Sequence, residues 1–167
     1  ENCNSCRDHI EVVVLPVVAD QLPPRGVLGL VDYRLGGHVS ESLARGTVTG
    51  SPLEQLILSG RPKLPFDKLF LVGVGPAAGF HPTLYAAAID VVLRVLSGWG
   101  VRRAVDELPG RAEGWIAPEL AVDILLERAE AYPNFDQWTL IDTPEAARVV
   151  TQGLRRERGA DWGTPRS

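Results

Sequence analysis

Hydrophobic and polar residues alternate along the chain in patterns that separate short strands from helices. Residues 9–18, "HIEVVVLPVV", predict a strand that ends at Pro16 or lies at a sheet edge, because proline cannot donate to a β-ladder. Residues 27–45, "VLGLVDYRLGGHVSESLAR", predict one or two short helices with Gly36 and Gly37 as their joint. Residues 51–60, "SPLEQLILSG", alternate as a half-buried strand does.

The middle of the chain carries the strongest pattern. Residues 66–75, "FDKLFLVGVG", are apolar through their centre, as in a strand at the middle of a sheet. From residue 81 to 97 the period becomes helical, and Asp90 and Arg94 are expected to pair at i,i+4. The apolar side of this helix is formed by Leu84, Ala88, Val91, Val92, Val95 and Leu96.

The remaining segments complete an α/β pattern. Residues 101–108 and 135–142 predict strands, residues 117–133 predict a helix, and a last helix is expected from Thr143 onward. A βαβ unit over residues 66–108 requires a parallel pair of strands. The order predicts a three-layer α/β/α sandwich around a mixed, mostly parallel sheet. We expect flexible tails at residues 1–8 and 159–167, with one domain at 9–158.

Composition narrows the classes of partner. The chain has 167 residues, of which 45% are hydrophobic and 23% charged, and its formal net charge is −4. This balance argues against electrostatic binding of nucleic acid or of an acidic membrane. Apolar stretches are broken well before the ~18 residues of a membrane helix. With only two cysteines, a reducing cytoplasm is the expected location.

The turn between the central strand and the long helix is the main candidate site. Backbone N–H groups hold phosphates at this position in nucleotide-binding proteins. The candidate residues are Gly73, Val74, Gly75, Ala77, Ala78 and Gly79. However, Pro76 removes one donor, no lysine follows as in a Walker loop, and the spacing is not G-x-G-x-x-G. Asp106 and Glu107 lie roughly where a ribose-binding acid is expected. We favour a turn that reverses the chain over a phosphate cradle.

Other residue groups give weaker signals. Cys3, Cys6 and His9 are the candidates for a metal, but zinc needs four ligands and the other histidines are far along the chain. Segment 38–41 contains a histidine, a serine and a glutamate but lacks a nucleophile elbow. These groups predict no catalytic residue, no metal site and no cofactor.

Two charged stretches are interpreted as solvated surface. Glu119, Asp123 and Glu127 line one face of a predicted helix at four-residue spacing. The arginines of segment 155–158 form a small basic patch, but no aromatic platform for bases accompanies them.

Three segments together resemble the N-terminal domain of the leucyl (cytosol) aminopeptidases: "VDYRLGGHVSESLARGTVTGSPLEQLIL", "DKLFLVGVGP" and "VRRAVDELPG". The matching positions are Asp32, Gly36, Gly37, Gly50, Leu56–Leu58, Leu71–Gly73 and Gly75. The resemblance covers roughly residues 9 to 150 and implies a macro-domain-like fold. In that family the chemistry belongs to a separate C-terminal domain with two metal ions, whose "NTDAEGR" ligand segment has no match here.

Three functions remain open at this point. The first is a non-catalytic domain with an assembly, regulatory or protein-interaction role, in contact with a protein partner or with itself. The second is an ADP-ribose or nucleotide binder that uses the 73–79 turn, which the macro-like fold suggests. The third is a fragment of a two-metal aminopeptidase whose catalytic domain is absent from this chain. We favour the first, with no enzymatic activity in this chain alone.

Overall fold

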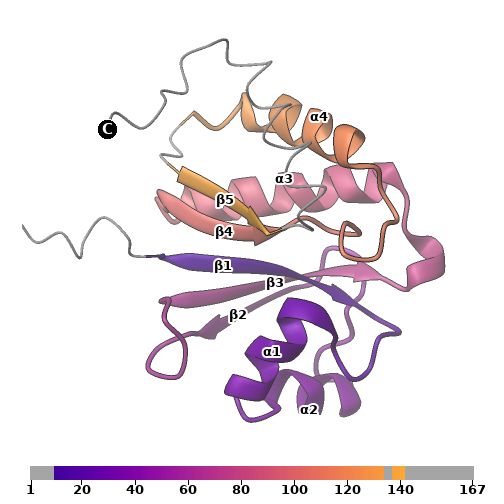
Figure 1. Ribbon diagram of the computed structural model, residues 1–167, viewed down its shortest axis with the longest axis vertical. Helices are drawn as coiled ribbons and strands as arrows, with labels where there is room; N and C mark the ends of the chain where they lie inside the picture. Colours follow the sequence, from indigo (N-terminus) through magenta and orange to yellow (C-terminus); the bar gives the residue numbers. More distant parts are fainter. Residues whose placement is uncertain (1–9, 134–136, 142–167) are drawn as a thin grey trace, which may run out of the picture.

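The computed structural model describes residues 10–133 and 137–141. A five-stranded sheet in the order β2-β3-β1-β4-β5 lies between two helical layers (Figure 1). Every neighbouring pair is parallel except β2 and β3. The strands are β1 (Val12–Val18), β2 (Gln55–Ser59), β3 (Lys68–Gly75), β4 (Arg103–Glu107) and β5 (Gln137–Ile141). The predicted α/β/α sandwich with a mixed, mostly parallel sheet is confirmed.

The helices cover opposite faces of the sheet (Figure 1). One layer contains α1 (Gly26–Arg34) and α2 (His38–Ala44), and the other contains α3 (Pro82–Gly98) and α4 (Pro118–Ala129). A short 3-10 helix, η2 (Ala77–Gly79), precedes α3. None of the helices in the described ranges is long and apolar enough to cross a membrane. The helix predicted from Thr143 onward and both predicted tails lie outside the described residues.

Separate apolar clusters fill the two sides of the sheet. Val12 and Val14 of β1 belong to the cluster shared with α3, whereas Val13, Leu15 and Val17 belong to the cluster shared with α1 and α2. This alternation is the period of two of a β-strand. Because helices cover both faces, the strand is apolar at successive positions. β3 is also covered by helices on both faces, and this explains the apolar centre from which its place inside the sheet was predicted.

β1 neither ends at Pro16 nor lies at the edge of the sheet, so this part of the prediction was wrong. The strand ends at Val18 and lies in the interior of the sheet, between β3 and β4. Its ladder with β4 covers only Val12–Val14, whereas its ladder with β3 continues to Val18. Pro16 therefore lies where β1 has a hydrogen-bonding neighbour on one side only, which is where a strand accepts proline.

α3 is buried on two sides. Its predicted apolar side packs on the sheet, and a second side, with Tyr85, Ile89 and Leu93, packs against α4 and the segment before it. The expected Asp90–Arg94 pair does not form. Instead, Oδ2 of Asp90 accepts from Nη1 of Arg128 on α4 at 3.0 Å. The helical period could not reveal this partner, because it comes from another helix.

The carboxyl end of β3 packs tightly against the turn at residues 50–53. A Cβ atom on Gly73 would lie 2.1 Å from the carbonyl oxygen of Ser51. Gly75 has a φ of +75°, and a Cβ there would lie 2.9 Å from Cγ of Pro52. Both glycines therefore have a packing role that is independent of any ligand.

We expect Gly73→Ala to lower the free energy of unfolding by at least about 2 kcal/mol, because backbone atoms must move to admit the methyl group. The matched control is Gly98→Ala at the end of α3, where an added Cβ meets nothing within 4 Å. Urea denaturation followed by circular dichroism measures both. Equal stability of the two variants would contradict the close packing of β3 against this turn.

Candidate functional site

The glycine turn lies at the end of the sheet that is formed by the carboxyl ends of the parallel strands. Two hydrogen bonds join it to the segment that follows β1: the N–H of Ala19 donates to the carbonyl of Gly75 at 3.0 Å, and that of Ala77 donates to Oδ1 of Asp20 at 3.0 Å. At this end of the sheet the chain passes from β1 to α1 on one face and from β3 to α3 on the other (Figure 1). In open α/β sheets, ligands bind beyond the carboxyl ends of neighbouring strands whose following helices lie on opposite faces.

Most donors of the turn are already bonded within the protein. Four of the six candidate residues donate their backbone N–H to a protein oxygen at 2.7–3.0 Å: Gly73 to Glu54, Gly75 to Gly50, Ala77 to Asp20 and Gly79 to Pro76. At Ala77 the acceptor is a carboxylate, an anion in the position that a phosphate oxygen would take. Binding of a phosphate to the N–H of Ala77 would require Asp20 to leave. The geometry explains the turn as a structural reversal, and phosphate binding stays a prediction.

Asp32 accounts for the Gly36–Gly37 joint. Its buried carboxylate accepts from the backbone N–H of Val39 at 2.7 Å and of Ser40 at 3.2 Å, and from the Ser40 hydroxyl. It thereby satisfies donors at the start of α2, as a capping residue does. Gly37 has a φ of +79° and donates its N–H to the Asp32 carbonyl at 2.9 Å, which closes the joint.

This cap also determines what segment 38–41 can do. The Ser40 hydroxyl is bound to Asp32, and the His38 side chain lies in a pocket that Ser40 does not line. Glu41 pairs with Arg45 one turn along the helix. The histidine, serine and glutamate of this segment therefore do not form a nucleophile–base–acid chain.

The other candidate site residues from the sequence are either spread over an exposed surface or lie outside the described residues. Glu119, Asp123 and Glu127 are all exposed on α4, as expected of a solvated face. Across residues 10–133 and 137–141, no group of three or more histidine, cysteine, aspartate or glutamate side chains is arranged to hold a metal. Cys3, Cys6 and His9 lie outside those ranges, as does the basic segment 155–158.

A buried carboxyl group at the end of β4 went largely unrecognised in the sequence. Asp106 is 1% exposed, and its Oδ2 has no hydrogen-bond partner in the described part of the chain. Burial raises its pKa well above the ordinary value, and the charge of Glu107 raises that pKa further. The strand period was the available signal, because it puts Asp106 on the same face as Ala104, which is buried against α3.

The strand order and the two helical layers define a macrodomain-like α/β protein. The chain is similar to the Trypanosoma brucei macrodomain in complex with ADP-ribose, with a TM-score of 0.69 and 15% identity over 87% of this chain and 64% of that one. The Oceanobacillus iheyensis macrodomain with ADP gives 0.70 and 15%, covering 89% and 85%. A tomato leucine aminopeptidase mutant gives 0.59 and 13%, covering 93% and 34%.

The chain belongs to the cytosol aminopeptidase family, through the N-terminal domain of that family, whose model matches residues 13–131. A probable cytosol aminopeptidase of Dechloromonas aromatica is 31% identical over 65% of this chain and 22% of its own length. That of Halorhodospira halophila is 28% identical over 79% and 30%. The chain thus spans less than a third of either relative. The family resemblance and the macro-domain-like fold are confirmed.

The buried carboxyl of Asp106 predicts a specific pH dependence of stability. Its ordinary pKa is 3.8, and the folded state raises it, so the folded state binds the proton more tightly than the unfolded state. Its contribution to the free energy of unfolding is therefore full below about pH 4 and is lost as the pH rises through the folded pKa. Asp106→Asn removes the titrating group, so the variant should lose less stability than the wild type between pH 4 and pH 8.

Urea denaturation of both proteins between pH 4 and pH 8 measures this effect as the difference between their stability curves. Asp123→Asn, at an exposed position of α4, is the control and should leave the curve parallel to that of the wild type. Parallel curves for Asp106→Asn would mean that the buried carboxyl does not titrate differently in the folded state.

Proposed function

We propose that this domain is a non-catalytic interaction module of the cytosol aminopeptidase family, and that it docks through the outer face of α1. The observation that carries this proposal is the exposure of two large apolar side chains on that helix. Leu30 is 71% exposed and Tyr33 is 84% exposed. At a spacing of three residues they are neighbours on one side of the helix.

The opposite side of α1 supports this interpretation. Leu28 and Val31 are buried there against the sheet, so the helix carries large apolar residues on both its inner and its outer side. A helix of a globular protein normally keeps its outer side polar, unless that side is covered by something else. Tyrosine is enriched at protein interfaces, because its ring supplies apolar contact area and its hydroxyl a hydrogen bond.

We propose that the occupant is the catalytic part of a cytosol aminopeptidase. The relatives from Dechloromonas and Halorhodospira each carry more than two thirds of their length outside the matched region. In the tomato enzyme the matched fold is likewise the smaller portion of the chain. A module that accompanies a larger catalytic portion in its relatives needs a surface that contacts that portion. Peptidase activity would then belong to the partner. A cytoplasmic location, which the relatives' names support, is part of this proposal.

Binding to the catalytic portion of the Dechloromonas relative, measured by calorimetry, tests the proposal. Replacing both Leu30 and Tyr33 by glutamate should weaken binding at least tenfold, about 1.4 kcal/mol, because two charges would have to be buried in the interface. Leu120→Glu on α4 is the control, since Leu120 is also exposed, at 41%, but lies in the other helical layer. It should bind as the wild type does.

Two results would contradict this assignment. Equal binding by the wild type and the double variant would remove α1 from the interface. Self-association of the wild type in sedimentation velocity, lost in the double variant, would make a second copy of the chain the occupant. Thermal denaturation of each variant checks that the fold is retained.

The specific observation that favours a nucleotide-binding function is the similarity to macrodomains solved with ADP-ribose and with ADP. Under this alternative ADP-ribose binds at the 73–79 turn and at 100 times its dissociation constant stabilises the domain by about 2.7 kcal/mol. Asp20→Ala should then bind it more tightly, because the change frees the N–H of Ala77 and removes a negative charge.

A thermal-shift titration of both proteins, confirmed by calorimetry, measures this. Substitution of Gly73 or Gly75 is unsuitable here, because either change disturbs the packing against residues 50–53. If neither the wild type nor Asp20→Ala shows a saturable shift, ADP-ribose is not a ligand of this turn.

A further inference from the structure

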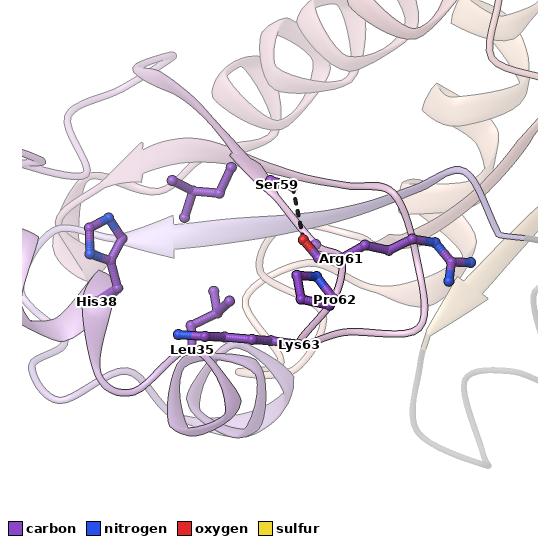
Figure 2. A pocket seen from close by; sticks show the side chains of 8 residues that line it. Leu35, His38, Ser59, Arg61, Pro62 and Lys63 are labelled. Atoms are coloured by element: carbon purple, nitrogen blue, oxygen red, sulfur yellow. Dashed lines mark hydrogen bonds between the residues drawn. The ribbon is translucent and has the colours of Figure 1, made fainter.

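A pocket of about 320 Å³ lies between the α1–α2 joint and the segment that connects β2 to β3. Leu35 and His38 line it from the joint, and residues 58–63 line it from the end of β2 and the connection (Figure 2). The pocket lies at the amino end of β3, whereas the glycine turn lies at the carboxyl end of β3. It is therefore separate from the nucleotide site considered above and from the outer face of α1.

The pocket lining is basic although the protein is acidic overall. His38, Arg61 and Lys63 line it, and none of its lining residues is an aspartate or a glutamate. The formal net charge of the whole chain is −4. Leu35, Leu58 and Pro62 add an apolar part. The combination of an apolar wall with a few basic groups is typical of sites for small organic anions.

Two of the three basic side chains lie toward the same side of the pocket. In Figure 2 the Lys63 side chain extends past Leu35 toward the side on which His38 lies, while the Arg61 side chain points the opposite way. Nε of Arg61 is 2.9 Å from Oδ1 of Asp67, so its charge is partly compensated within the protein. Lys63 has no ion pair with any residue in the described ranges. Lys63 is thus the full positive charge of the lining that the described residues leave uncompensated, and His38 lies on the side toward which it extends (Figure 2).

The surrounding structure holds the pocket in shape. The connection from β2 to β3 is fixed by the N–H of Gly60, which donates to the Asp67 carbonyl at 2.8 Å, and by the N–H of Leu64, which donates to the Gly60 carbonyl at 2.9 Å. Leu64 and Phe66 are buried in the cluster shared with α1 and α2. On the other side, the cap from Asp32 fixes the start of α2, where His38 lies. The backbone that carries the lining residues is therefore held in place before a ligand binds, and the His38 and Lys63 side chains are exposed at its surface.

We propose that this pocket binds a small organic anion with an apolar body, a phosphate monoester or a carboxylate. The Lys63 ammonium and a ring N–H of His38 would hold the anionic group. Leu35, Leu58 and Pro62 would contact the apolar body. This site is independent of docking through α1, since neither Leu30 nor Tyr33 lines the pocket.

An NMR titration of the whole chain with phenyl phosphate tests the proposal directly. Saturable shifts are expected for the backbone amides of residues 35–39, 58–61, 63 and 64, and none for those of residues 73–75 and 77–79. Lys63→Gln should weaken binding at least fivefold, because it removes a full charge from the site. The matched control is Arg94→Gln, which removes one positive charge from an exposed position on α3, in the opposite helical layer. It should leave the affinity unchanged.

Benzoate and benzyl alcohol in place of phenyl phosphate identify the chemistry that is recognised. Tighter binding of either anion than of the neutral alcohol supports the proposal and tells phosphate from carboxylate. The proposal is overturned if the alcohol binds as well as the anions, if Lys63→Gln and Arg94→Gln weaken binding equally, or if no saturable shift occurs near the pocket at millimolar phenyl phosphate.

Discussion

β1 and β3 are buried between two helical layers. Because both faces of these strands are covered, polar side chains that could bind a ligand have to lie outside them. Successive residues of both strands contribute to the clusters on either side of the sheet, so neither strand has a free face. Polar side chains therefore gather beyond the strand ends: Asp20 near the glycine turn, and Lys63 and His38 at the pocket. Asp106 and Glu107 of β4 are exceptions, because both carboxyl groups are buried.

The residues that carry the family resemblance serve the fold. Asp32 caps the start of α2, Gly37 allows the joint before it, and Gly73 lets β3 pack against residues 50–53. Each role follows from a backbone requirement that does not depend on catalysis. This explains how the family can be recognised in a chain that shows no match to the metal-binding segment of the aminopeptidases. The pattern identifies an architecture, and function has to be argued from individual sites.

Sequence reasoning succeeded where the signal was local and failed where a distant segment supplied the partner. The order of elements and the Gly36–Gly37 joint follow from period and from turn residues. The partner of Asp90 comes from α4, and the acceptor for the N–H of Ala77 is 57 residues earlier in the chain. The position of the candidate turn was therefore predictable, but the occupation of its donors was not. The basic pocket was hidden for the same reason, since His38 and Lys63 lie on separate segments.

The single antiparallel strand has a wider consequence. In a wholly parallel sheet, the segments that follow the strands all lie at one end of the sheet, beyond the carboxyl ends of the strands. Because β2 runs antiparallel to β3, the connection that follows β2 lies at the opposite end of the sheet. This connection contains Arg61 and Lys63. The basic pocket and the glycine turn are therefore built from different loops at opposite ends of the strands, so a substitution in one loop removes no residue of the other site.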